Sequence, residues 1–229
     1  MPGAELIDAI TSCYDHDGMD ETIVICRSNK RANLYNNGIR AQILWREDEL
    51  NTGDMLMIAK NNYYWTEQYK EMDFIANGEI AVVRRVRRTR EIYGFRFAEV
   101  TLRFPDQNDF ELDANLLLDT LHSDAPALSK EDSDRLFYTI LEDYADISNK
   151  RDRMQKMKAD PHYNALQVKY AYAVTCHKAQ GGQWQNVFLD QGYMTDEYLT
   201  PDYFRWLYTA FTRATKTLYL VNYPKEQIL

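Results

Sequence analysis

Two stretches of the sequence concentrate side chains that can bind phosphate or nucleic acid. The first, Ala171–Trp184, is an apolar run that ends in a dense polar cluster. A buried strand that delivers a working loop at its carboxyl end has this pattern. The paired glycines at its end allow a sharp turn or the close approach of a ligand to the backbone. The residues of the cluster are Thr175, His177, Lys178, Gln180, Gly181, Gly182 and Gln183.

The second stretch, Leu207–Val221, carries an arginine near the end of an expected helix. The pattern predicts a helix from Pro201 to about Ala214, with a proline in the first turn, where it is tolerated. A β-rich run, Thr217–Val221, follows at once. Arg213 can therefore direct a planar, permanently charged guanidinium at a phosphate. The alternative is an arginine that pairs with an acidic neighbour at a helix end.

Together, the two stretches resemble motifs V and VI of superfamily-one helicases, most closely the RecD-like branch of the UvrD/RecD group, which includes exodeoxyribonuclease V alpha. The family pattern is a strand, Thr-x-His-Lys-x-Gln-Gly, then Tyr-Thr-Ala-x-Thr-Arg-Ala and a final strand. The resemblance implies an α/β fold, the RecA-like second motor domain of an ATP-dependent DNA helicase. The matching residues are Thr175, His177, Lys178, Gln180 and Gly181, then Tyr208, Thr209, Ala210, Thr212, Arg213 and Ala214.

The resemblance implies nucleotide contacts for three residues. Arg213 matches the arginine that the second motor domain supplies to the γ-phosphate of ATP. Gly181 and Gln183 match positions near the nucleotide. The sequence departs from the family at Gln183, where a glutamate is usual; an amide can still hydrogen-bond a ribose hydroxyl, but it lacks the negative charge.

The resemblance also implies contacts with single-stranded DNA. Thr175 and His177 match positions that touch the DNA backbone, and Lys178 is placed to join them through its charge. A hydrogen-bonded structural role remains the alternative for His177.

The motifs that hold phosphates and Mg²⁺ are missing. The sequence has no Gly-x-x-x-x-Gly-Lys-Ser/Thr and no Asp-Glu pair after an apolar strand, although P-loop catalysis needs both elements. If the resemblance holds, the first motor domain lies elsewhere and this chain is a carboxyl-terminal portion of a longer helicase. ATP and Mg²⁺ are then cofactors of the complete enzyme. The fragment alone requires neither and is expected to be inactive.

The chain begins with an α/β half-unit. A helix is expected over residues 4–13, a buried strand over Thr22–Cys26, and a helix from a Ser28 or Asn29 cap to about Ile39. The family often carries Asn and Arg near this helix. Asn36, Asn37 and Arg40 match loosely, but capped helix residues with solvated polar groups explain them equally well, and we assign no site to them.

The sequence pattern changes at Gly53, from which short β-type runs separated by turns predict a small barrel. Their Gly-Asp, Asn-Asn-Tyr and Asn-Gly-Glu-Ile strings resemble the SH3-like barrel that RecD-type helicases insert into the second motor domain. The matching residues are Gly53, Asp54, Asn61, Asn62, Tyr63, Asn77, Gly78, Glu79 and Ile80.

The expected organisation is therefore a motor domain interrupted by two insertions. Residues 1–52 form its first part, 53–125 the barrel insert, 126–165 a helical excursion and 166–229 its second part with both motifs. The helical excursion should start at a Ser129 cap, and its apolar residues recur at helical spacing, which favours a core-facing stripe.

An arginine cluster lies within the expected barrel. On a regular strand these side chains would alternate between two faces, so they could not all line one groove. They form either a DNA-backbone patch or an exposed edge strand that its charge keeps soluble; the second interpretation is favoured. The cluster consists of Arg84, Arg85, Arg87, Arg88 and Arg90.

The composition is that of a globular protein, with 229 residues, 45% hydrophobic and 27% charged. No apolar run approaches the roughly 20 residues needed to cross a bilayer, and the start lacks signal-peptide features. Three scattered cysteines favour the cytoplasm. The net charge of −8 disfavours a surface that binds nucleic acid everywhere, but it permits a narrow basic groove.

The expected partners are single-stranded DNA and the missing amino-terminal motor domain, with no membrane; other subunits are unknown. Two other functions stay open. A stand-alone module could bind single-stranded nucleic acid without motor activity, and a structural or partner-docking remnant would bind neither DNA nor nucleotide. Other enzyme chemistry is disfavoured because the chain lacks Gly-x-Ser-x-Gly and clustered metal ligands.

Overall fold

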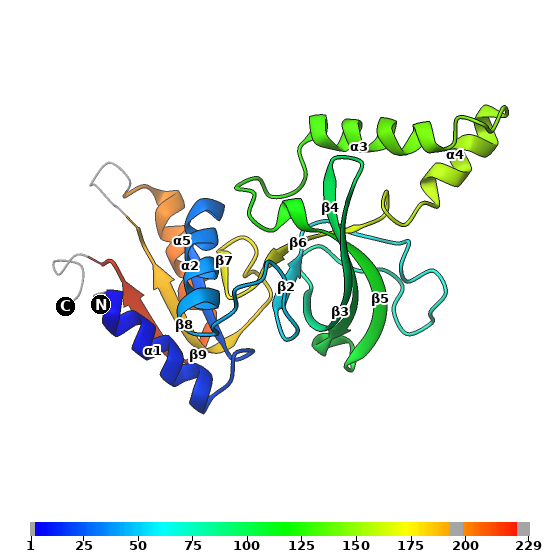
Figure 1. Cartoon of the computed structure of the whole chain (residues 1–229). Helices are drawn as coiled ribbons and strands as arrows, with labels where there is room; N and C mark the ends of the chain where they lie inside the picture. The colour runs from blue at the N-terminus through cyan, green and yellow to red at the C-terminus, as the bar shows by residue number, and fades with distance from the viewer. Residues whose placement is uncertain (1–2, 193–198, 224–229) are drawn as a thin grey trace. The chain divides into compact units, whose positions relative to one another are not determined.

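The computed structural model describes residues 3–192 and 199–223, and these form two compact units. One, here called the α/β unit, combines the residues up to Glu47 with those from Ala171 onward. The other, the barrel unit, is Asp48–Tyr170 (Figure 1). None of the helices in the described ranges has the length and apolar character needed to cross a membrane.

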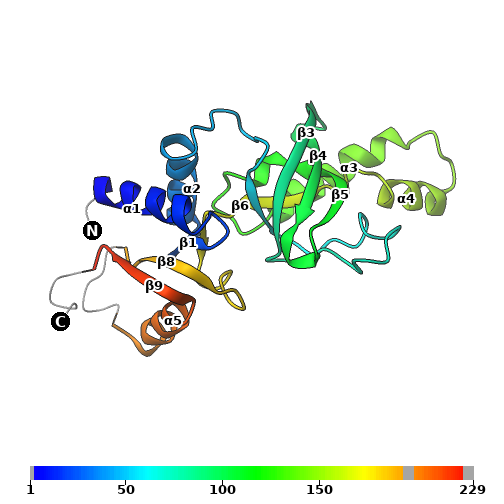
Figure 2. The same ribbon diagram turned by 90° about the horizontal axis from the view of Figure 1, so that it is seen from below.

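The α/β unit is built on a parallel sheet whose four described strands lie in the order β7–β1–β8–β9. Figure 2 shows α1 and α2 on one face of this sheet and α5 on the other. A parallel sheet covered on both faces explains why every residue of β1 is buried and why its sequence is continuously apolar or β-branched. The strands are β1 (Thr22–Cys26), β7 (Ala173–Thr175), β8 (Trp184–Asp190) and β9 (Ala214–Val221), and the helices are α1 (Gly3–His16), α2 (Asn29–Gln42) and α5 (Pro201–Phe211).

The predicted amino-terminal half-unit is confirmed. The strand Thr22–Cys26 has the expected bounds. Ser28 caps α2, because its hydroxyl accepts a hydrogen bond from the backbone N–H of Arg31 at 3.2 Å. The helix continues to Gln42, one turn beyond the expected end near Ile39.

Asn36 has a structural role. The sequence allowed a solvated side chain as one interpretation, but the residue is buried. Its side chain is 2% exposed. The amide donates to the backbone carbonyl of Ala173 at 2.9 Å and accepts from the N–H of the same residue at 2.8 Å. Asn36 thus completes the hydrogen bonding of the edge strand β7 in place of a further strand.

The barrel unit, all of whose residues are described, contains a closed barrel in the order β2–β3–β4–β5–β6. This confirms the small barrel expected from the short β-type runs. Its interior holds alternating apolar residues such as Val100 and Leu102, both almost fully buried. The strands are β2 (Met55–Ile58), β3 (Ile80–Ile92), β4 (Phe95–Phe104), β5 (Phe110–Leu117) and β6 (Leu166–Tyr170).

The last barrel strand comes from the segment that the sequence analysis assigned to the returning motor domain. β6 pairs in parallel with β5 and antiparallel with β2, so it closes the barrel. The run Leu166–Thr175 was expected to lead directly into the α/β fold. Instead it bends at Ala171 and Tyr172, and its two halves belong to different sheets. The barrel unit therefore spans Asp48–Tyr170, whereas the expected domain bounds were 53, 125 and 166.

The predicted helical excursion is present as α3 (Lys130–Asp143) and α4 (Lys150–Lys158). Ser129 caps α3, because its hydroxyl accepts from the N–H of Asp132 at 3.0 Å. The expected apolar stripe is confirmed as a core-facing stripe. It packs on the outside of β4 in a cluster made of Phe95, Phe97, Leu117, Leu136, Ile140 and Met157.

The turn after α4 is held by the carboxylate of Asp160. Tyr144 donates its hydroxyl to this carboxylate at 2.8 Å, and the backbone N–H groups of His162 and Tyr163 donate at 2.7 and 3.2 Å. Partial burial raises the pKa of the Asp160 carboxyl, but the hydrogen bonds from His162, Tyr144 and the backbone outweigh it and lower the pKa to about 2.

Candidate functional site

The polar cluster of the first motif forms a tight turn at the carboxyl end of β7. The carbonyl of Thr175 accepts hydrogen bonds from the N–H groups of Lys178 at 2.9 Å and of Ala179 at 3.1 Å. Ala179 is buried beneath the turn, whereas His177 is exposed and Lys178 is half-buried. Partial burial lowers the pKa of the Lys178 ammonium.

The exposure of His177 bears on its two interpretations. His177 is exposed, and its imidazole makes no hydrogen bond with any residue that the structure describes. The turn presents the side chain of His177 to solvent, where it can meet a ligand.

The two glycines are needed for different reasons. Gly181 has a φ of +89°, in the left-handed region that favours glycine, and a Cβ there would meet nothing within 4 Å. Gly182 is required by space, because a Cβ would lie 2.3 Å from Cη2 of the Trp184 ring. Trp184 thus packs directly over the backbone of Gly182.

Arg213 lies at the corner between α5 and β9 and not within a helix. α5 ends at Phe211, three residues before the expected end at Ala214. The helix stops early because Ala214 already pairs with Trp184 across the β8–β9 ladder, which requires extended backbone.

Three hydrogen bonds fix the guanidinium of Arg213. Nε donates to the carbonyl of Thr209 at 3.1 Å, Nη1 to the carbonyl of Gly182 at 3.0 Å, and Nη2 to the hydroxyl of Thr212 at 3.1 Å. The Thr212 hydroxyl in turn donates to the Thr209 carbonyl at 2.9 Å. The partner of Arg213 is therefore the glycine turn, and the acidic neighbour considered as an alternative is absent from its described contacts.

The predicted site residues fall into two groups, one at the carboxyl ends of the parallel strands and one at their amino ends. Thr175 pairs with Cys26 at the carboxyl end of β1, whereas Asn186 pairs with Thr22 at the amino end of the same strand. The loop of residues 176–183 therefore crosses from one edge to the other. Thr175, His177 and Lys178 lie where this loop starts. Gly181, Gln183 and Arg213 lie where it ends.

Two kinds of residue were missed by sequence reasoning. Thr209 and Thr212 orient Arg213, and their place in the matched motif was the available signal. Arg27 follows β1 directly, and its guanidinium carbon lies 5.6 Å from the ring centroids of both Tyr203 and Trp206 on α5. A polar residue after a fully buried strand was the signal for Arg27.

The guanidinium of Arg213 is chemically suited to a phosphate. Arg213 offers a charged, pre-oriented fork of the kind that binds phosphate oxygens. Within residues 3–192 and 199–223, no group of three or more His, Cys, Asp or Glu side chains could hold a metal ion.

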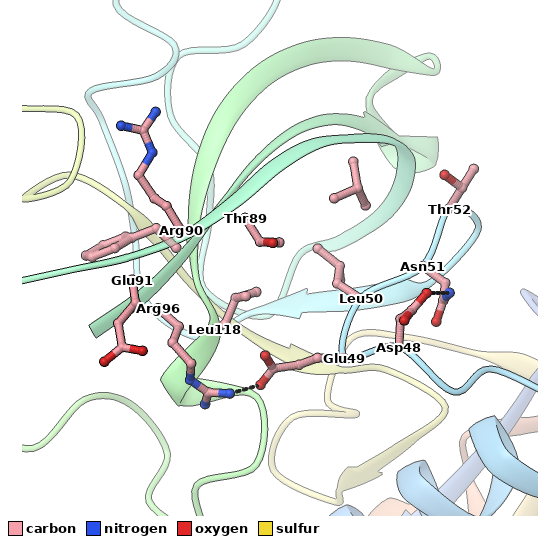
Figure 3. Close-up of a pocket in the computed structure, with 12 residues that line it drawn as sticks. Asp48, Glu49, Leu50, Asn51, Thr52, Thr89, Arg90, Glu91, Arg96 and Leu118 are labelled. Atoms are coloured by element: carbon pink, nitrogen blue, oxygen red, sulfur yellow. Dashed lines mark hydrogen bonds and ion pairs between the residues drawn. The ribbon is translucent and has the colours of Figure 1, made fainter. Parts of the chain in front are cut away.

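The barrel unit has a separate cleft of about 670 Å³. It borders the part of β3 that extends past the residues paired with β2. Figure 3 shows Glu49 and Arg96 directed at each other across it, with their side chains 2.6 Å apart. Arg96 also pairs with Asp119 at 3.4 Å. The charges in this wall of the cleft are thus matched internally.

Comparison with known proteins supports one class of domain. Residues 170–221 match the UvrD-like helicase C-terminal domain family. This is less than a quarter of the chain, but it contains both motifs and all six predicted site residues. The match supports a superfamily-one helicase C-terminal domain over this segment. No curated protein matches the chain.

The chain also aligns with solved structures of Pif1 helicases. A Bacteroides Pif1 in complex with ADP-AlF3 and ssDNA has 14% identity and a TM-score of 0.49, and the match covers 100% of this chain and 48% of that one. Candida albicans Pif1 has 11% identity and a TM-score of 0.47, over 98% and 54% of the two chains. The chain spans about half the length of these structures.

Proposed function

We propose that this chain is the carboxyl-terminal motor portion of an ATP-dependent, superfamily-one DNA helicase. In this proposal the α/β unit is the RecA-like second motor domain, and the barrel unit is its SH3-like insertion. ATP binds between this domain and a first motor domain that supplies the P-loop and the Mg²⁺ ligands. A RecD-like enzyme that moves 5′ to 3′ along single-stranded DNA is the specific form that we propose.

The hydrogen bond between Arg213 Nη1 and the Gly182 carbonyl carries the proposal. It joins the two matched motifs, which are distant in sequence, at one corner of the sheet. An arginine held by carbonyl and hydroxyl acceptors, without a carboxylate among its described contacts, keeps its charge available to a phosphate. Such an arginine stabilises the charge that develops on the phosphoryl group in the transition state.

In this proposal the loop of residues 176–183 couples the DNA contacts at its start to the nucleotide contact at its end. Its first residues present His177 and Lys178 to a phosphodiester backbone, and its last residues hold Arg213 through Gly182. When Arg213 moves to a phosphate, the carbonyl of Gly182 loses its donor. The free energy of the loop then depends on the nucleotide, and the DNA contacts at its other end depend on it too.

DNA-stimulated ATP hydrolysis tests the proposal, measured with this chain joined to the first motor domain that the proposal requires. Arg213→Ala should lower kcat by about 10³- to 10⁵-fold, and the variant should still bind single-stranded DNA. The control is Arg205→Ala, which removes an arginine from the exposed side of α5, where its ion pair among the described residues is with Asp202. That variant should turn over normally.

The DNA contacts are tested separately, on the chain alone. Lys178→Gln should reduce the slope of log K against log salt for a single-stranded oligonucleotide by about 0.7, because one phosphate contact is lost. Normal turnover in the Arg213→Ala enzyme would overturn the motor assignment. Salt-sensitive DNA binding would then favour the stand-alone binding module, and the loss of all binding would favour the structural remnant.

A further inference from the structure

Two consecutive β-bulges interrupt β3 where it carries the arginine cluster. The register against β4 shifts between Val83 and Arg85 and again between Val86 and Arg88. Each bulge inserts one extra residue opposite a single residue of the partner strand. The sequence of this stretch, VRRVRRTR, accordingly has a period of three, in place of the period of two of a regular strand.

The bulges place every third residue of β3 on one face, where Val83 is buried, Val86 is half-buried and Thr89 is exposed. Val83, Val86 and Thr89 lie opposite Leu102, Val100 and Ala98, which line the barrel interior. Directly opposed residues of an antiparallel pair share a face. This face of β3 therefore contains only the valine and threonine positions of the repeat.

All five arginines consequently lie on the outer face, which corrects the expectation that they alternate between two faces. Arg85 and Arg88 lie opposite Thr101 and Glu99, which point outward. The three others reach outward-facing carboxylates: Arg84 pairs with Glu111 at 3.1 Å, Arg87 with Asp113 at 2.6 Å, and Arg90 with Glu99.

The carboxylates leave two of the arginines unmatched. Arg85 and Arg88 are exposed and make no ion pair with any described residue. The ion pairs with carboxylates fix the side chains of the other three arginines, Arg84, Arg87 and Arg90. The protein as a whole is acidic, with a net charge of −8, so a locally positive strip runs against the overall balance of charge. Repulsion within such a strip is a cost that an anionic ligand would relieve.

We propose that this outer face of β3 is a second nucleic-acid contact, which binds the phosphodiester backbone through Arg85 and Arg88. The outward positions of β4 and β5 that lie level with Arg85 and Arg88 carry Glu99, Thr101, Asp113 and Asn115, which offer no aromatic ring on which a base could stack. The contact is therefore with phosphates and is independent of base sequence. It lies in the barrel unit and does not require the motor assignment to hold.

The test measures the Kd of the full chain for a labelled oligonucleotide over a range of salt concentrations, with single-stranded and duplex forms as separate arms. Arg85→Gln/Arg88→Gln should reduce the slope of log K against log salt by about 1.4 for a single strand or about 1.8 for a duplex. The arm that shows the loss identifies the form of nucleic acid bound. Thermal unfolding confirms that these exposed substitutions leave the fold intact.

A matched control separates a local contact from overall charge. Lys70→Gln/Lys130→Gln removes two exposed lysines of the same unit that have no described ion pair, and it changes the net charge equally. Its salt slope should stay at the wild-type value.

A second variant tests the opposite sign. Glu111→Gln/Asp113→Asn frees Arg84 and Arg87, so the slope should become steeper. Equal slopes for wild type and Arg85→Gln/Arg88→Gln in both arms would overturn the proposal, as would an equal loss in the lysine control. Either result leaves the Arg213 test unaffected, because that test reads ATP turnover.

Discussion

Gly182→Ala should destabilise the α/β unit through a clash with the Trp184 ring. The added Cβ would lie 2.3 Å from Cη2 and 2.9 Å from Cζ2 and Cζ3 of the indole. Ordinary contact begins at 3.4 Å, so the ring must retreat by about 1 Å. It cannot retreat with its backbone, because the Trp184 N–H donates to the Arg213 carbonyl at 2.9 Å within the β8–β9 ladder.

The cost follows from this geometry. Forcing a packed side chain off its position costs about 1–3 kcal/mol, and we expect about 2 kcal/mol of lost unfolding free energy here. Gly181→Ala is the matched comparison, since its Cβ meets nothing within 4 Å and only the left-handed φ of +89° opposes it. That strain costs about 1–2 kcal/mol.

A double-mutant cycle with Trp184→Ala distinguishes the two causes. In that background Gly182→Ala should cost almost nothing, so the coupling energy should be about 2 kcal/mol. The cost of Gly181→Ala should stay unchanged. The assay is urea unfolding followed by circular dichroism, fitted with one transition for each compact unit. An equal cost of Gly182→Ala in both backgrounds would refute the steric argument.

Two further predictions concern stability. Asn36→Ala should lower the free energy of unfolding in urea by about 2–3 kcal/mol, because it removes both hydrogen bonds to Ala173 and leaves buried backbone groups unpaired. Asn37 is exposed on the same helix, so Asn37→Ala should stay within about 0.5 kcal/mol of wild type. Equal losses in the two variants would contradict the role of Asn36. The lowered pKa of Asp160 stabilises the fold above the unfolded pKa of 3.8, and this stability should be lost as the pH falls from 3.8 to about 2. Unfolding measured across this range should show a smaller acid loss for Asp160→Asn than for wild type, and identical pH profiles would count against this assignment.

The sequence by itself determined the local elements and the identity of the two motifs. β1 could be predicted with its bounds because a strand buried on both faces must be continuously apolar. Ser129 could be predicted as a cap, and Ser28 as one of two candidate caps with Asn29, because capping depends on residues within one turn. The candidate site residues were also readable, because their types and spacing are local properties of the chain.

The tertiary structure decided which sheet each strand joins and which partner each polar side chain meets. β6 closes the barrel because its partners, β2 and β5, are distant in sequence, and an apolar run does not specify its partners. Arg213 finds Gly182 only because β8 and β9 lie side by side. The sequence contained the period of three in β3, but only the register against β4 showed that each extra residue is a bulge that turns every arginine outward. Side-chain direction on a strand depends on pairing, and pairing is a long-range property that the local sequence does not determine.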